Sequence, residues 1–291
     1  MLYILQTIIF SIWLFGVIKK GKYSWHAIIS TYCIFLLTID TVEAITSSAL
    51  GFYSFPAHLF SDHIKDETFG FIISDGIILP FTGIIFCHYV TQTKKFWRII
   101  LMFVSLQMIL EWVYVRSGYL LYHKWNIGLS LIFYFVGFSI TVKYASNLMR
   151  YNPPVPYSVR LAAATYAAVE WPVAFLCGLL KLFEWKPELF PWLFAKQPLP
   201  FIAIAWVLVL SAAVIVPKTL SEYRPMVFFI LAALGTYFSY FAHGQGWLIY
   251  YRWNNFLTVL RLFIPFIIIN LYDHWESTYL PKTNTISQKG S

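Results

Sequence analysis

The sequence predicts an all-α protein, a polytopic bundle of about nine transmembrane helices. Hydrophobic residues make up 59% of the 291 residues and charged residues only 12%, about half the charged share of soluble domains. So few charges cannot cover the surface of a water-soluble particle of this size. The apolar residues form long runs, and about 20 apolar residues in a helix cross the hydrocarbon core of a bilayer. The 20% aromatic content suits a chain that is anchored at two membrane interfaces.

Nine apolar runs are candidate spans, and a count of eight to ten is compatible with the pattern. In chain order they cover residues 2–18, 27–50, 70–91, 97–117, 127–149, 160–182, 200–217, 226–248 and 256–272. Residues 1–272 are therefore expected to form one transmembrane domain, and residues 273–291 a polar cytoplasmic tail. The first run has no basic residue before it and no small-residue cleavage site, so a retained span is expected rather than a signal peptide.

Short polar or proline-containing breaks set the ends of these runs. Lysines close the first span at residues 19–22 and the third at residues 94–95. Prolines separate the later spans, because proline lacks a backbone N–H and clashes with the preceding helical turn. These prolines are Pro153, Pro154, Pro187, Pro191, Pro198, Pro200 and Pro217.

The distribution of Lys and Arg predicts the orientation in the membrane. Counted over alternate loops and ends, one side carries 13 basic residues and the other 7, with Arg261 inside a span. Because cytoplasmic loops are enriched in Lys and Arg, the richer side is expected to be cytoplasmic. The N-terminus is then outside and the C-terminus inside, which an odd number of spans requires. The net charge of +8 reflects topology rather than a nucleic-acid partner.

No motif in the sequence identifies a cofactor or a metal. Cys33, Cys87 and Cys177 are far apart in apolar runs and are expected to be buried thiols that pack as small hydrophobic groups. The histidines form no di-iron box, and no nucleotide-binding, metalloprotease or nucleophile-elbow motif is present. Membrane lipids are the partners that the composition implies, and the oligomeric state and any cofactor stay open.

Ionisable and polar residues inside the spans are the candidate site. A charged side chain near the bilayer centre costs about 2.5–3.5 kcal/mol, so by default such a residue marks a functional position. The residues selected on this basis as a substrate- or ion-binding site are Asp40, Glu43, Asp75, Gln107, Glu111, Tyr166, Glu170, His243 and Arg261. Asp40 and Glu43 are three residues apart and are expected to share one helix face.

The depth of these residues predicts a shared cavity. At about 1.5 Å per residue, the acids and Arg261 lie roughly 7–18 Å from the outer ends of their spans, nearly all in the outer half. Five acids against one arginine leave negative charge that protons or a bound cation must neutralise. Proton relay and an oxygen-rich metal site with His243 are both open. The structural alternative for each acid is a hydrogen bond between helices, worth about 0.6 kcal/mol on average.

Two stretches suggest an internal repeat. Glu111 to Trp125 and Glu170 to Trp185 both run from a Glu-Trp pair through a Gly and two leucines to a Trp. In the predicted topology both helices run from the cytoplasm outward, so the repeat would be parallel, as in some transporters. Chance similarity in a chain rich in Leu and Trp is the alternative.

One part of the chain resembles a known but uncharacterised family. Glu111-Trp112, followed by Tyr122, Trp125, Ser130 and Tyr134, is similar to a pattern in small multi-pass membrane proteins of spore-forming bacteria. The resemblance covers about residues 27–149 with a loose motif, and the second half departs from it. It implies a bacterial plasma membrane location and no known activity.

Three functions are compatible with these features. The first is a transporter or permease-like protein for a small solute or cation, coupled to protons or cations, with Asp40, Glu43, Glu111 and Glu170 at its site. The second is an intramembrane enzyme that acts on a lipid or lipid-linked substrate with the same acids in acid–base or metal chemistry. The third is a structural or assembly protein of the cell envelope. The transporter is the leading hypothesis, and a lateral opening to lipid would favour the enzyme.

Overall fold

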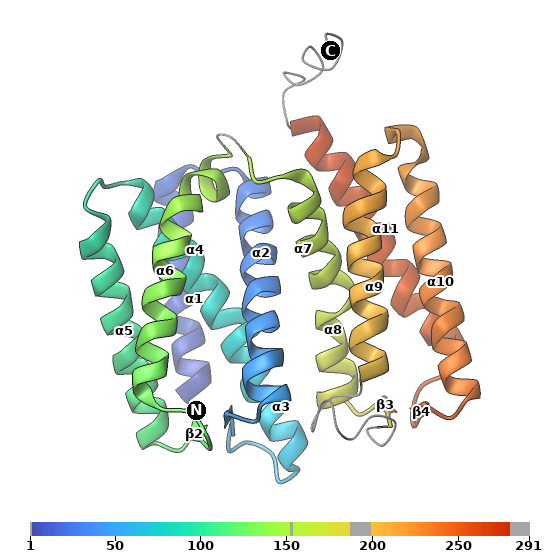
Figure 1. Cartoon of the computed structure of the whole chain (residues 1–291), viewed down its shortest axis with the longest axis horizontal. Coiled ribbons are helices and arrows are strands. Elements are labelled where there is room, and N and C mark those ends of the chain that lie inside the picture. The colour runs from blue at the N-terminus through green and yellow to red at the C-terminus, as the bar shows by residue number, and fades with distance from the viewer. Residues whose placement is uncertain (1, 152–153, 187–198, 280–291) are drawn as a thin grey trace.

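The computed structural model describes residues 2–151, 154–186 and 199–279, and it confirms a multi-pass helical membrane protein. Eight helices in these residues are long and apolar enough to cross a membrane, and a shorter apolar helix covers Ala205–Lys218. The helices lie side by side, and the chain begins at one end of the bundle while its last helix finishes at the other (Figure 1). The predicted count of about nine crossings therefore holds for the described residues.

Two groups of helices follow one another along the chain. The first contains α1 (Leu2–Gly21), α2 (Trp25–Glu43), the π-helical turn η1 (Ala44–Ala49), α3 (His63–Ile73), the π-helical turn η2 (Ser74–Ile78), α4 (Leu79–Thr91), α5 (Phe96–Arg116) and α6 (Ile127–Arg150). The second contains α7 (Tyr157–Val169), α8 (Trp171–Val173), the π-helical turn η3 (Ala174–Leu179), α9 (Leu199–Ile215), the short 3-10 turns η5 (Val216–Lys218) and η6 (Ser221–Tyr223), α10 (Arg224–Gly244) and α11 (Asn255–Tyr279). Helices α2 and α7 pack together where the groups meet.

Two small antiparallel ladders lie at one end of the bundle (Figure 1). Strand β1 (Tyr53–Ser54) pairs with β2 (Leu121–Tyr122), and β3 (Phe183–Trp185) pairs with β4 (Leu248–Tyr250). The first ladder joins the loop after α2 and η1 to the loop before α6, and the second joins the loop after α8 and η3 to the loop before α11. The lysine-rich loops lie at the opposite end, so the ladder end is the one that the basic residues predict to be outside.

Side-chain caps fix where several helices begin. The hydroxyl of Ser24 accepts a hydrogen bond from the Ala27 amide at 3.2 Å, and the side chain of Asn126 accepts one from Leu129 at 3.0 Å. Such caps satisfy amides that have no partner within the helix. Asp62 caps α3 in the same way, and so the third span begins at residue 63 rather than at residue 70 as predicted. Asp75 consequently lies deeper within its span than the sequence suggested.

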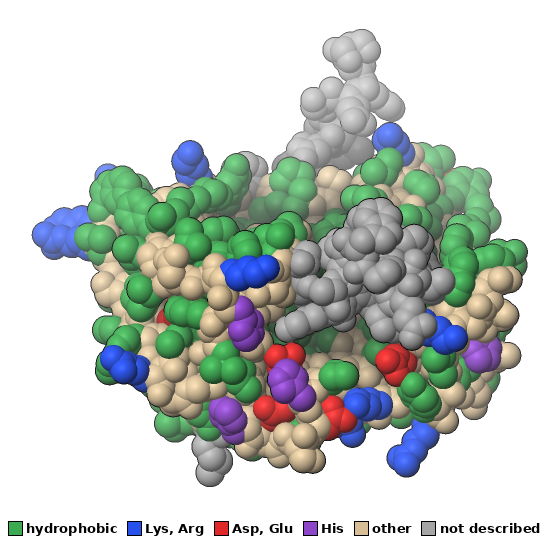
Figure 2. All heavy atoms as spheres, turned by 60° about the horizontal axis from the view of Figure 1, so that its bottom comes forward, with side chains coloured by type: hydrophobic (Ala, Val, Ile, Leu, Met, Phe, Trp, Pro, Cys, Tyr) green, Lys and Arg blue, Asp and Glu red, His purple; other side chains and the backbone are tan. Residues whose placement is uncertain are grey.

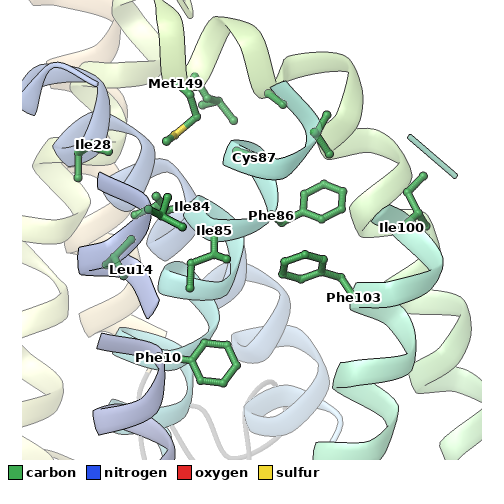
Figure 3. Packing of buried hydrophobic residues seen from close by; sticks show 14 of the residues in the cluster. Phe10, Leu14, Ile28, Ile84, Ile85, Phe86, Cys87, Ile100, Phe103 and Met149 are labelled. Atoms are coloured by element: carbon green, nitrogen blue, oxygen red, sulfur yellow. The ribbon is translucent and has the colours of Figure 1, made fainter. Parts of the chain in front are cut away.

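The core of the first group is apolar and centred on α4 (Figure 3). Phe10 of α1, Phe86 of α4 and Phe103 of α5 are all at most 3% exposed, and the last two rings meet edge to face at 5.3 Å. Lipid is as apolar as these side chains, so helix association here depends on close packing and on polar contacts between helices rather than on the hydrophobic effect. A second apolar cluster joins α7, α9, α10 and α11.

The predicted tail begins later than residue 273. Helix α11 continues to Tyr279, and Asp273 and Glu276 are buried. The guanidinium of Arg160 donates to Glu276 at 2.7 Å, and that of Arg224 donates to Asp273 at 3.2 Å. The two acids are three residues apart and share one helix face, which turns toward these arginines. The polar composition that predicted a tail thus reflects a buried network at the bundle end opposite the ladders.

The predicted pairing of Glu111 with Glu170 as repeat positions is not what the fold contains. Glu111 lies in α5, shortly before β2, whereas Glu170 lies between α7 and α8, before the π-helical turn η3. The element that corresponds to η3 in the first group is η1, which follows α2.

Candidate functional site

A cavity of about 630 Å³ lies among the helices of the first group. Four of the residues selected from the sequence line it: Glu43 of α2, Asp75 of η2, and Gln107 and Glu111 of α5. The further polar residues of its wall are Gln6, Thr38, Thr46, Tyr53, Ser74, Thr82, Tyr114, Tyr122, Trp125, Ser130, Tyr134 and Thr141. The remaining wall is apolar. The acids therefore stand at one part of a largely hydrophobic space.

Glu111 is held by three hydroxyl groups. Tyr122 of β2 and Ser130 of α6 both donate to Glu111 Oε1, and Tyr134 also donates to this carboxyl group. The Trp125 indole donates to the Ser130 hydroxyl at 2.7 Å, which fixes that donor in turn. All the donors reach Glu111 from β2 and α6, and Oε2 has no hydrogen-bond partner among the described residues.

Glu43 has a similar arrangement on the facing helix. The Tyr53 hydroxyl donates to Glu43 Oε1 at 2.7 Å and lies 2.7 Å from the Thr46 hydroxyl. Glu43 Oε2 has no partner in the described chain. The π-helical turn η1 follows Glu43 directly and leads the chain into β1, so the backbone returns Tyr53 to the carboxyl group. Glu43 and Glu111 both line the cavity, so two carboxyl groups share one space.

Asp75 and Gln107 are less well paired. Asp75 is fully buried in the π-helical turn η2, and neither of its carboxyl oxygens has a well-aligned donor among the described residues. It interacts electrostatically with Glu43. The Gln107 side-chain nitrogen also lacks an acceptor. π-Helical turns inside longer helices are frequent at functional sites.

Four residues of the cavity wall thus carry buried polar atoms without a well-aligned hydrogen-bond partner in the described chain. These atoms are Glu43 Oε2, both carboxyl oxygens of Asp75, Gln107 Nε2 and Glu111 Oε2. More than nine in ten buried polar groups in proteins have a hydrogen-bond partner, so each exception needs an explanation. Several exceptions in one space are most simply explained by a polar group or water that the cavity receives.

The cavity reaches the lipid-facing surface between α2 and α6. Its wall there includes Thr38 and Val42 of α2 and Val136, Gly137 and Ile140 of α6, all of them exposed on the helix surface. Since both helices are membrane spans, these exposed residues face hydrocarbon. Side chains of β1, β2 and the segment that follows each strand line the ladder end. The exposed part of the cavity wall thus lies on the sides of two membrane-spanning helices.

Asp40, Tyr166, Glu170 and Arg261 lie outside this cavity. The Tyr166 hydroxyl donates to Asp40 Oδ2 at 3.3 Å, and Glu170 interacts with both Asp40 and Arg261. These side chains come from α2, α7, the α7–α8 junction and α11, so they form a second polar cluster where the two groups of helices meet. Asp40 and Glu43 are on the same helix, but Asp40 contacts Tyr166 of α7, whereas Glu43 lines the cavity of the first group.

His243 lies apart from both clusters. It is near the end of α10, where its Nδ1 lies 2.8 Å from the Leu248 carbonyl oxygen and its ring stacks on Tyr250 at 3.9 Å. A metal site that combines His243 with the acids is therefore not formed. Within the described residues, no group of three or more His, Cys, Asp or Glu side chains has the arrangement of a metal site.

The hydroxyl donors were not selected from the sequence as site residues. Tyr53, Thr46 and Gln6 give no signal in an apolar chain that holds 20 tyrosines. Tyr122, Trp125, Ser130 and Tyr134 did have a signal, because they are the residues on which the family resemblance was based. In the structure these four gather around Glu111 and its donors.

The ladder end carries acidic, basic and histidine side chains over the loops (Figure 2). One contact there joins the two groups of helices: the Lys181 ammonium group donates to Asp62, the residue that caps α3. This hydrogen bond lowers the pKa of the Asp62 carboxyl group. Both side chains are more than one-third exposed, so the pair contributes little to stability.

No protein-family model, curated protein or solved structure matches this chain.

Proposed function

We propose that this protein is an intramembrane acid–base enzyme that takes a lipid or lipid-linked substrate from the bilayer into the cavity. The observation that carries the proposal is the combination of unpaired carboxyl oxygens with an apolar wall that opens between two membrane spans. The hydrocarbon chain of a lipid fits the apolar wall. Its polar group fits the carboxyl groups, which would otherwise remain without partners.

The geometry of Glu43 and Glu111 suits proton transfer. Each carboxyl group is oriented through one oxygen by hydroxyl donors, and the other oxygen of each has no hydrogen-bond partner in the described chain. A general acid or base needs this combination of fixed orientation and a free oxygen within reach of the substrate. No Lys, Arg or His is among the described residues of the wall, so protons or a cation must balance the negative charge. One protonated and one ionised carboxyl group would supply an acid and a base.

Transport of a water-soluble solute, the leading hypothesis from sequence, has less support. Aromatic side chains from the β1 and β2 region, among them Tyr53, Tyr122 and Trp125, form the wall at the ladder end. The exposed residues of the wall are on the sides of α2 and α6. Access from lipid agrees with the enzyme hypothesis. A purely structural role is less well supported, because several carboxyl oxygens in the cavity wall have no hydrogen-bond partner in the described chain.

A side chain placed in the mouth of the cavity tests this proposal. A Cβ atom at Gly137 would meet no atom within 4 Å, so Gly137→Phe is expected to fold and to block the gap between α2 and α6. The lipid that copurifies with the protein in mild detergent, measured by mass spectrometry per mole of protein, should fall about tenfold. The matched control is Gly16→Phe in α1, where a Cβ atom also meets open space but outside the cavity. Equal lipid retention in the wild type and both variants would contradict the proposal.

A further inference from the structure

The two groups of helices repeat the same order of elements. In the first, α2 ends in a π-helical turn, β1 follows, two helical passages lead to β2, and α6 completes the group. In the second, the α7–α8 passage ends in a π-helical turn, β3 follows, α9 and α10 lead to β4, and α11 completes the group. Corresponding passages run in the same direction (Figure 1). Helix α1 has no counterpart among the described residues.

Backbone details agree at a constant spacing in the first part of each group. In the first, Leu50 N–H donates to Ile45 O at 3.0 Å and Phe52 N–H donates to Thr46 O at 2.9 Å. In the second, Leu180 N–H donates to Phe175 O at 3.0 Å and Leu182 N–H donates to Leu176 O at 3.1 Å. Between these bonds, Gly51 and Lys181 both have a positive φ, 61° and 49°. Lysine rarely adopts a positive φ. Its presence at the position equivalent to Gly51 therefore indicates that both segments follow the same backbone path.

The last part of each group agrees in sequence as well. Residues 120–130 read LLYHKWNIGLS and residues 248–258 read LIYYRWNNFLT. The Trp125 indole donates to Ser130 at 2.7 Å, and the Trp253 indole donates to Thr258 at 2.9 Å. Asn126 and Asn254 cap the helix that follows. Gly118 and Gly246, before these segments, have φ of 78° and 69°, where glycine avoids strain.

The contact between the groups has the form expected of a twofold pair. In such an interface, the same surface of each copy faces its equivalent. Helix α2 packs on α7, and the register set by the π-helical turns makes Asp40 of α2 equivalent to Glu170 at the end of α7. These two acids interact with each other. The second polar cluster therefore lies at the junction of the copies.

We infer that residues 25–150 and 157–279 are two copies of one four-helix unit, and that only the first copy keeps the acidic site. The register of the π-helical turns places Val173 where the first copy has Glu43. The register of residues 120–130 and 248–258 places Gly235, Ser239 and Ala242 where the first copy has Gln107, Glu111 and Tyr114. The second copy has thus exchanged the acids for small or apolar residues and kept Tyr250, Trp253 and Thr258. Its role is that of a structural partner, and the α1 residue Gln6 adds to the first site alone. The single-site part of this inference rests on the proposed function.

Matched substitutions in the two copies test the inference. Tyr122→Phe removes a donor to Glu111, and Tyr250→Phe removes the equivalent hydroxyl in the second copy. Tyr122→Phe is expected to slow lipid conversion about tenfold, the effect of one hydrogen bond to a charged group, whereas Tyr250→Phe should leave conversion unchanged. An equal reduction in both variants would show a second working site and overturn the assignment.

The repeat itself has a test that needs no lipid. Asn126→Ala and Asn254→Ala remove equivalent helix caps, and each is expected to lower Tm by a similar few degrees. Ser239→Glu should restore a carboxyl group beside the Tyr250 and Thr258 hydroxyls, and dicyclohexylcarbodiimide should then add to it as a stable N-acylurea, detected by peptide mass spectrometry. Unequal losses in the cap variants, or a folded Ser239→Glu protein without modification at residue 239, would contradict the duplication. Failure of the lipid test alone would contradict only the single-site part.

Discussion

Replacing Glu111 with glutamine is expected to abolish acid–base activity while lipid binding persists. Glutamine keeps the oxygen that accepts from Tyr122 and Ser130, so the cavity should retain its shape. It cannot donate or accept a proton as a carboxylic acid does, and such a group contributes about 10²–10⁴-fold to the rate of a proton-transfer reaction. The measurement compares lipid extracts of membranes that contain the wild type or the variant, and it follows the species that the wild type consumes and forms.

The control for this experiment is Glu222→Gln. Glu222 is an exposed acid in η6, in the loop between α9 and α10, and its neutralisation should leave lipid conversion unchanged. Full conversion by the Glu111→Gln variant would remove Glu111 from the chemistry. A loss of both bound lipid and fold would instead assign Glu111 a structural role.

Replacing Arg160 with methionine is expected to give the largest loss of stability. The Arg160 and Glu276 side chains are each 2% exposed and lie 2.7 Å apart, and Tyr151 donates to the same carboxyl group at 2.8 Å. Removal of one partner of a buried ion pair leaves an uncompensated charge and costs about 3–5 kcal/mol. Unfolding in mixed detergent micelles, followed by circular dichroism, should show this loss.

The double variant Arg160→Met/Glu276→Leu separates the pair from its surroundings. Replacement of a whole buried ion pair by apolar residues is often neutral, so the double variant is expected to recover most of the stability lost in Arg160→Met. The single variants Arg160→Met and Glu276→Leu are measured for comparison. If the double variant loses as much stability as the two single variants together, the pair does not act as a unit.

Hydropathy was sufficient to predict the fold class, because a bilayer requires long apolar helices and this requirement is visible in composition. The convergence of Glu43, Asp75, Gln107 and Glu111 was also predictable. Buried charge is costly in every helix that carries it, so acids on several spans are expected to share a polar space. Their hydroxyl partners carry no such cost and do not stand out in an apolar sequence.

The predictions that the structure corrects failed for physical reasons. Asp40 and Glu43 are on neighbouring parts of one helix surface, but α2 lies at the junction of the two copies, so one acid turns to α7 and the other to the cavity. Asp273 and Glu276 resemble a solvated tail until their arginine partners are known. The Glu-Trp pattern that predicts a repeat can arise by chance where Leu and Trp are abundant, whereas the turns, caps and ladders set another register.

Photo-crosslinking tests the central claim most directly. The protein in lipid nanodiscs is exposed to a phospholipid that carries a diazirine on its acyl chain, and the modified residues are identified by peptide mass spectrometry. Modification is expected on inward-facing residues of the apolar wall such as Phe35 and Leu79, and Gly137→Phe should suppress it. Modification confined to outward-facing residues such as Phe229 and Tyr237, which are more than 60% exposed, with the cavity residues unmodified, would contradict a lipid-accessible acidic site.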